Sequence, residues 1–224
     1  VFTSLTQMRL SYPLERVKFL PPTMPKKIWC IGRNYAGHAK ELNHEIPTEP
    51  LVFLKATSAI TGSGDFIRIP NWAGAVHYEG ELAVVIGRSG KNISESEALD
   101  YVAGYSIMND VTAREMQKRD GQWMRSKSFD TFAPFGPAVL MQKELPPSTV
   151  LRTLVNGRVR QQSEISDMIF SVPRIISHIS RFATLEQGDV IATGTPEGVG
   201  AIAPGDVVEV EIDGIGRLRN ICTE

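Results

Sequence analysis

The stretch VHYEGELAVVIG, residues 76–87, constrains the fold most, because two glutamates lead directly into an apolar run. That run is rich in β-branched residues and ends at Gly87, which predicts a buried strand. Side chains alternate along a strand, so Glu79 and Glu81 point to the same face, roughly 7 Å apart. Any fold of this chain must therefore balance two like charges at the entry to its core.

A solvated strand end is one explanation for Glu79 and Glu81, but two features argue against it. Residues 73–85 contain no lysine or arginine, so neighbouring sequence offers no ion pair. The next apolar strand, over residues 101–109, also ends in an acid, Asp110. We therefore expect these carboxylates to converge on one site.

Carboxylates that converge without histidine or cysteine favour a hard cation, Mg²⁺ or Mn²⁺ before Zn²⁺. Such a cation would remove the repulsion between the acids and leave about three positions open for water or substrate. His77 alternates onto the same face as the glutamates. It could be a fourth ligand, although packing or support of a ligand is the favoured interpretation.

A helix is predicted after Asp110, in the segment VTAREMQKR. If it starts near Asp110, Arg114 and Gln117 lie on one face above the metal, where they could hold a substrate carboxylate or carbonyl. Exposed side chains without a role are the alternative for both residues.

Strands dominate the rest of the predicted secondary structure. Asn156-Gly157 between two extended runs, residues 151–162, predicts a hairpin. Ser94, followed by Glu97, predicts a helix over about 95–101. Ser171 is expected to cap a helix with an apolar face, which consists of Ile175, Ile176, Ile179 and Phe182.

The predicted helices do not alternate with strands as a doubly wound sheet requires, so we expect a mixed, β-rich α/β fold. The stretch FLPPTMPKK, residues 19–27, is the most convincing linker in the 224 residues. It divides a short N-terminal segment, residues 1–25, from the main domain, residues 26–224.

Composition excludes several classes of partner. Lysine and arginine total 24 against 25 acidic residues, a net charge of -1, so we expect no nucleic acid or membrane partner. No apolar run approaches the roughly 18 residues of a membrane span, and the first residues lack a signal-peptide pattern. We expect a cytoplasmic protein, with an organelle address left open because the chain begins at Val1. Cys30 and Cys222 are expected to be reduced, structural thiols.

Six separated motifs resemble the fumarylacetoacetate hydrolase family, specifically its short single-domain members. They are GRNYAGHAKEL, EGELAVVIG, MNDVTAREMQ, SKSFDTFAPFGP, VNGRVRQQ and VIATGTPEGVG. Their order and spacing match over about residues 26–220. Two departures stand out: an N-terminal aspartate ligand of long members has no counterpart, which suggests that water completes the metal shell, and FLKA replaces the common FLKP.

The resemblance implies a rolled, mixed β-sheet, a homodimer, and Mg²⁺ or Mn²⁺ bound by three carboxylates. Carried over residue by residue, the metal ligands are Glu79, Glu81 and Asp110. The active-site lysine, glutamine and arginine fall on Lys127, Gln117 and Arg114. The threonine of the TGTP turn falls on Thr195, and the lid histidine and glutamate fall on His38 and Glu41.

His38 and Glu41 are three residues apart, so on a helix the carboxylate can orient the imidazole as a base. A solvated surface is the alternative for this pair. Gly37 weakens the predicted helix, so it could act as a lid that encloses the substrate and excludes water. Around Thr195, backbone N–H groups and the hydroxyl could face a distal carboxylate.

A small 2-oxo acid bound to such a metal through its carboxylate and keto oxygens predicts a metal-stabilised enolate intermediate. If His38 activates water, the reaction is hydrolysis of the C–C bond of an acylpyruvate, which we favour. Oxaloacetate decarboxylation and isomerisation or tautomerisation of 2-oxo dicarboxylates are the alternatives at the same site. From a different class, a non-catalytic, metal-dependent dicarboxylate-binding protein is conceivable, although binding alone needs no positioned base.

Overall fold

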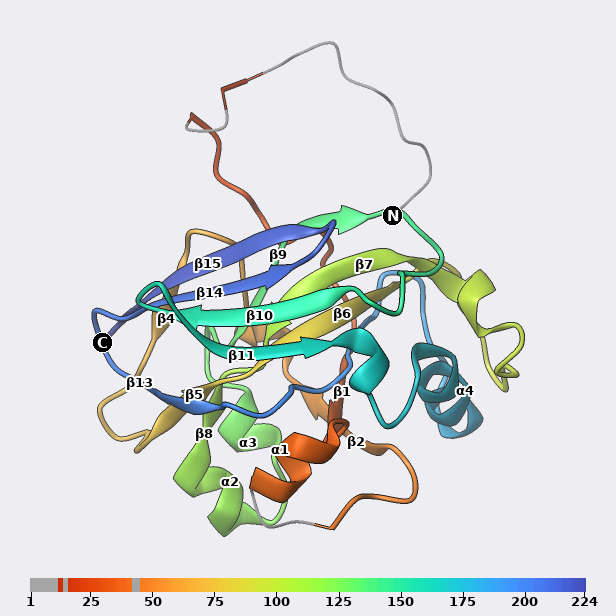
Figure 1. The fold of residues 1–224 in the computed structure, drawn as a ribbon, viewed down its shortest axis with the longest axis horizontal. Coiled ribbons are helices and arrows are strands. Elements are labelled where there is room, and N and C mark those ends of the chain that lie inside the picture. The colour runs from red at the N-terminus through yellow and green to blue at the C-terminus, as the bar shows by residue number, and fades with distance from the viewer. Residues whose placement is uncertain (1–11, 14–15, 42–44) are drawn as a thin grey trace.

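The computed structural model describes residues 12–13, 16–41 and 45–224. Strands make up most of its regular structure and form curled, mixed sheets, with short helices at the edges (Figure 1). The predicted mixed, β-rich fold is confirmed. Within the described ranges, no helix has the length and apolar character needed to span a membrane.

The large sheet has β6 near its centre and follows the order β2-β1-β12-β6-β7-β9-β3. β6 pairs antiparallel with β7, whereas β1 pairs parallel with β12, so the sheet is mixed. Every residue of β6 is buried, as the apolar run predicts. The strands of this sheet are β1 (Ile28–Gly32), β2 (Leu51–Lys55), β3 (Ile60–Thr61), β6 (Gly80–Ile86), β7 (Val102–Asn109), β9 (Ala133–Leu140) and β12 (Val190–Ala192).

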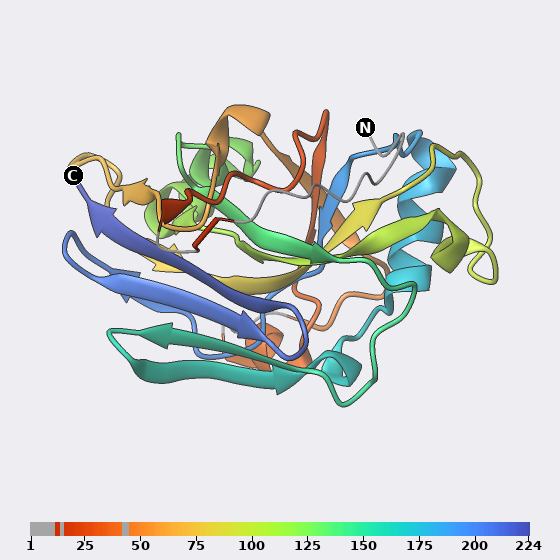
Figure 2. The same ribbon diagram turned by 90° about the horizontal axis from the view of Figure 1, so that it is seen from above.

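A second sheet, in the order β11-β10-β14-β15-β4, packs beside β6 and β7 (Figure 2). The predicted hairpin joins its strands β10 and β11, and Asn156 and Gly157 adopt the positive φ angles, 52° and 74°, of that turn. The strands are β4 (Phe66–Arg68), β10 (Val150–Val155), β11 (Arg158–Glu164), β14 (Val207–Ile212) and β15 (Gly216–Thr223).

A third, small sheet contains β13 (Gly200–Ile202), β5 (Val76–Tyr78) and β8 (Thr112–Ala113).

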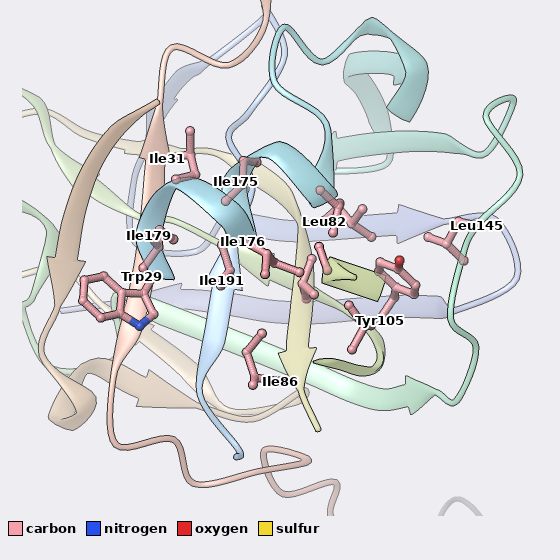
Figure 3. Packing of buried hydrophobic residues seen from close by; sticks show 14 of the residues in the cluster. Trp29, Ile31, Leu82, Ile86, Tyr105, Leu145, Ile175, Ile176, Ile179 and Ile191 are labelled. Carbon is pink, nitrogen blue, oxygen red and sulfur yellow. The ribbon is translucent and has the colours of Figure 1, made fainter. Parts of the chain in front are cut away.

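The helices are short apart from α4 (Val172–Phe182). Ser171 caps α4 as predicted, since its side chain accepts a hydrogen bond from the Arg174 backbone N–H at 3.4 Å. Ile175, Ile176 and Ile179 point into the main core, against side chains of β1, β6 and β12 (Figure 3). The other helical elements are α1 (Ala36–Glu41), α2 (Arg114–Asp120), α3 (Met124–Lys127) and the 3₁₀ turns η2 (Thr57–Ala59), η3 (Ala98–Tyr101) and η4 (Ile165–Asp167).

Two predictions about helices were wrong in detail. The helix expected over 95–101 is only the 3₁₀ turn η3, because the Ser94 hydroxyl bonds the Glu97 carboxylate at 2.6 Å instead of capping a backbone N–H. Phe182 does not join the buried face of α4. It is 55% exposed and packs edge-on against the Trp29 ring.

Of the N-terminal segment predicted over residues 1–25, the structure describes residues 12–13 and 16–25, and the boundary at residue 26 stays a prediction. Both cysteines are free and buried, as expected. Burial raises the pKa of the Cys222 thiol to about 12 and that of Cys30 well above its usual range.

Candidate active site

Strand register brings the predicted acidic residues together. Gly80 of β6 pairs with Asn109 of β7, which places Glu79 and Asp110 side by side just beyond the paired ends. The Asp110 backbone N–H donates to the Glu79 carbonyl at 2.8 Å, and the Glu79 N–H donates to Asn109 Oδ1 at 2.9 Å. Glu81 follows two residues along β6, on the same face. The antiparallel pairing therefore builds the convergence that the sequence predicted.

The three carboxylates form a buried cluster, here named the acidic triad: Glu79, Glu81 and Asp110. Each offers an oxygen, and these oxygens all lie within 4.8 Å of one another. Two oxygens bound to one cation at 2.1–2.6 Å are at most about 5 Å apart, so the spacing suits a single ion. An all-oxygen set also matches the preference of Mg²⁺ and Mn²⁺. The residues present thus fit a divalent cation.

The solvated strand end is excluded, because exposure of the triad is 4% or less. The expectation that the acids lack basic partners was also wrong. Lys127 Nζ bridges Glu79 Oε2 at 2.7 Å and Asp110 Oδ2 at 2.6 Å. Arg114 Nη2 donates to the other Glu79 oxygen, and Lys55 Nζ donates to Asp110 Oδ1, each at 2.5 Å. These cations lie on α3, α2 and β2, outside residues 73–85, so the lack of lysine and arginine in that stretch did not exclude ion pairs.

Three buried cations thus pair with two members of the acidic triad, Glu79 and Asp110. Burial alone would raise the pKa of Glu79, but the charges of Lys127 and Arg114 hold it well below its usual range. Burial opposes the charged form of Lys127, yet Asp110 and Glu79 raise its pKa. For Glu81, burial raises the pKa well above its usual range, and the neighbouring acids add to this. Its only described donor is the Gly194 N–H, at 2.8 Å.

His38 and Glu41 are neighbours on α1, as predicted. His38 is 5% exposed, and its Nδ1 lies 3.3 Å from Glu41 Oε2. The Glu41 carboxylate also accepts the Gly198 backbone N–H, at 3.1 Å, so α1 is fastened to the turn that follows Thr195. A Cβ at Gly37 would meet only the carboxylate of the exposed Glu197 side chain, which can move aside.

The remaining predicted site residues lie around the same centre. Gln117 Oε1 accepts a hydrogen bond from Arg114 Nη1 at 2.6 Å. Helix α2 begins at Arg114 rather than near Asp110, which still keeps Arg114 and Gln117 on one face. The Thr195 hydroxyl donates to the Gly80 carbonyl at 2.8 Å, so its proton supports β6 instead of facing a ligand.

His77 does not belong to the acidic triad. It pairs with Thr112 and Ala201 in the third sheet, and its buried Nδ1 has no hydrogen-bond partner in the described part of the chain. Burial, helped by the charge of Arg114, lowers its pKa to about 4. His77 is therefore neutral at physiological pH and packs beside the site.

A cavity of about 310 Å³ opens above the acidic triad. His38, Arg114, Gln117, Lys127 and Thr195 line it together with the triad. Figure 1 shows α1, α2 and α3 gathered at the same end of the molecule, and these helices supply most of those side chains. Strands thus form the floor of the cavity and helices its walls.

Lys55, at the end of β2, was not among the predicted site residues, although it is the lysine of the FLKA motif. The signal that could have identified it is a charged residue at the end of the otherwise apolar run LVFLK. Two cavity-lining cations, Arg33 and Lys118, were not predicted either.

Residues 27–222 match the family model described as "Fumarylacetoacetate (FAA) hydrolase C-terminal". The chain belongs to the fumarylacetoacetate hydrolase family. The match spans all the site residues described above.

Individual relatives within the fumarylacetoacetate hydrolase family carry several activities in their names. Oxaloacetate tautomerase YisK of Bacillus subtilis is 44% identical over 97% of this chain and 74% of its own length. The structure of 5-carboxymethyl-2-hydroxymuconate delta-isomerase from Mycobacterium smegmatis is 46% identical, with a TM-score of 0.89, and covers 96% of this chain and 86% of that one. Fumarylpyruvate hydrolase from Pseudomonas aeruginosa, solved with Mn²⁺ and pyruvate, is 36% identical, with a TM-score of 0.84, over 89% and 90% of the two chains.

Proposed function

We propose that the chain is a divalent-metal-dependent enzyme that interconverts the keto and enol forms of small 2-oxo acids. One observation carries this proposal: a histidine base, His38, lines the same cavity as the acidic triad and Lys127. A cation held by Glu79, Glu81 and Asp110 would supply Lewis acidity to the oxygens of the substrate. The names of the tautomerase and isomerase relatives support this class of reaction.

Each site residue has a role in binding the substrate or in transferring the proton. Arg114, Gln117 and Lys127 bind the polar end of the substrate and orient it. Glu41 holds His38 Nδ1–H, which keeps Nε2 free to accept a proton. His38 Nε2 takes a proton from the carbon next to the keto group and, as imidazolium, gives it to the keto oxygen as the enol forms, which leaves His38 neutral again. Conversion of the enol to the keto form runs through the same two transfers in the opposite order.

The size of the cavity supports a small substrate. The volume of about 310 Å³ is at the lower end of the range of about 300–1,000 Å³ that is typical of small-molecule sites.

A second candidate is the hydrolysis that the sequence favoured, in which His38 activates a water that cleaves the C–C bond of an acylpyruvate. The fumarylpyruvate hydrolase structure, with pyruvate bound, favours it. The same arrangement of base and cation serves both reactions, and hydrolysis additionally requires a bound water.

A cytoplasmic location and a homodimer stay predictions. Localisation experiments can check the first, and sedimentation can check the second.

A substrate panel with Mg²⁺ or Mn²⁺ tests the proposal. We expect faster conversion of enol-oxaloacetate to the keto form, followed by absorbance, and the loss of this rate in chelator. Acylpyruvate and fumarylpyruvate in the same panel report hydrolysis, and release of CO₂ from oxaloacetate reports decarboxylation. Inertness toward every 2-oxo acid in the panel, with either metal, would refute the proposal and favour a binding protein.

A further inference from the structure

Gln161, in the motif VNGRVRQQ, is a buried amide of the second sheet that reaches the strand of the two glutamates. It lies on β11 and is 1% exposed. Its Oε1 accepts the Gly80 backbone N–H at 3.1 Å, and its Nε2 donates to the Thr195 hydroxyl at 2.8 Å and the Pro196 carbonyl at 2.7 Å. A Cβ on Gly80 would collide with the Thr153 hydroxyl of β10, so the second sheet packs directly on β6 at this residue. One side chain thus joins the second sheet, β6 and the turn after β12.

The end of β12 explains why Gly80 is bound by side chains. The register of β12 with β6 runs from Val85 to Ala83, and Gly80 lies three residues nearer the start of β6. There, Gln161 accepts the Gly80 N–H, and the Thr195 hydroxyl donates to the Gly80 carbonyl at 2.8 Å. Buried backbone groups need such partners, because an unpaired one costs about as much as a lost hydrogen bond. The two side chains therefore take the place of a neighbouring strand.

Gly80, Thr195 and Gln161 form a closed hydrogen-bonded ring, and the backbone fixes the direction of each bond. The Gly80 N–H can only donate, so the amide oxygen of Gln161 faces it. The Pro196 carbonyl can only accept, so the amide nitrogen faces that side. The Thr195 hydroxyl then accepts from Gln161 and gives its own proton to the Gly80 carbonyl. Methionine at position 161 would break three bonds, and valine at position 195 would break two.

The hydrogen-bonded ring holds both glutamates of the acidic triad. Gly80 is the residue between Glu79 and Glu81, so the ring fixes the peptide units from which both carboxylates extend. On the turn, Thr195 follows Gly194, whose N–H donates to Glu81 Oε2 at 2.8 Å. The ring therefore fixes Glu81 from two sides, through its own backbone and through the donor to its carboxylate.

We propose that Gln161 is a positioning residue for the metal site. It holds the peptide between Glu79 and Glu81, and the turn that carries the Gly194 donor, in the arrangement that one cation requires. This inference rests on the proposed function, in which the acidic triad binds the cation. Loss of the Gln161 amide should weaken cation binding about 10–100-fold, the range found when a group that orients a metal ligand is removed.

The test is Mn²⁺ titration by calorimetry of the full chain, beside urea unfolding of each variant in chelator. Gln161→Met, which keeps the length of the side chain, should bind Mn²⁺ about 10–100-fold more weakly than wild type while still folded. Gln162→Met is the matched control, because Gln162 is the next residue on β11 and its side chain is exposed. It should bind Mn²⁺ as the wild type does.

Thr195→Val interrupts the same hydrogen-bonded ring and keeps the size of the side chain, so it should also weaken Mn²⁺ binding. If the ring acts as one unit, the double variant, Gln161→Met with Thr195→Val, should bind Mn²⁺ about as well as the weaker single variant. Losses that multiply in the double variant would overturn the inference, since the two residues would then act independently. If Gln161→Met does not fold, Thr195→Val decides, and wild-type Mn²⁺ affinity in it overturns the inference.

Two further outcomes separate this inference from the proposed function. Wild-type Mn²⁺ affinity in folded Gln161→Met overturns the inference while the proposed function stands, even if urea unfolds the variant more easily, because Gln161 would then serve only the fold. Failure of the wild type itself to bind Mn²⁺ overturns the proposed function together with the inference.

Discussion

Lys55 and Asp110 form an ion pair of 2.5 Å in which neither side chain is more than 1% exposed. Lys55 Nζ also donates to the Val111 carbonyl at 3.2 Å, so it fixes both the carboxylate and the backbone beyond β7. This pair joins the edge strand β2 to the acidic triad across the large sheet.

Replacement of Lys55 by methionine, which has a similar length, should destabilise the metal-free protein. The change removes one of the two buried lysines that pair with Asp110 and leaves only Lys127 to compensate that carboxylate, so the expected cost is up to about 3–5 kcal/mol. Urea unfolding in the presence of chelator measures the loss. Arg152→Met is the control, because Arg152 forms a partly exposed pair with Asp213 and its loss should cost no more than about 1 kcal/mol. Equal stability of Lys55→Met and wild type would show that the pair contributes nothing.

His38→Ala should keep metal binding and lose turnover, because His38 moves a proton and does not belong to the acidic triad. A loss on the order of 10²-fold or more is expected for a general base. Binding of oxalate, a flat pair of carboxylates that resembles the polar end of the substrate, should be unchanged. Calorimetry beside turnover measures both properties for each variant.

Glu41→Gln should behave as a milder form of His38→Ala, since the amide oxygen can still accept a hydrogen bond from Nδ1 or from Gly198. Lys40→Ala, on the exposed side of the same helix, should match the wild type. If His38→Ala lost its metal, or if Lys40→Ala were equally slow, a proton-transfer role for His38 would be wrong.

The two thiols should be inert in the folded protein. Burial raises the pKa of Cys222 to about 12 and that of Cys30 well above its usual range, so neither forms a thiolate at neutral pH. A thiol reagent such as DTNB should report almost no reaction in buffer and two thiols per chain in 6 M guanidinium. Rapid modification of either cysteine in the native protein would contradict the described burial.

Local patterns predicted those parts of the fold and site that depend on near neighbours. The turn at Asn156 and Gly157 and the cap at Ser171 depend on a few adjacent residues, and both are present. The two glutamates of the triad face the same side because strands alternate, and Asp110 joins them because consecutive antiparallel strands pair at that end.

Features that depend on long-range contacts were not visible in the sequence. Lys55 reaches Asp110 only after β2 pairs with β1 at the edge of the sheet, a contact over 55 residues of sequence. The surroundings of Arg33 depend on Asn34 bonding to Phe170, 136 residues away. A local signal also failed at Ser94, where the serine bonds a side chain instead of the backbone. Site residues named only through the family resemblance, such as Lys127, lie at the cavity because the shared fold brings them there.

The most direct test of the account is Mn²⁺ titration by calorimetry of wild type and Glu81→Gln, which keeps the size of the side chain but not its charge. Wild type should bind one Mn²⁺ per chain and show oxaloacetate tautomerase activity in proportion to occupancy. Glu81→Gln should fold, bind Mn²⁺ weakly or not at all, and be inactive. Wild-type Mn²⁺ affinity in Glu81→Gln would contradict the assignment of the acidic triad as the metal site.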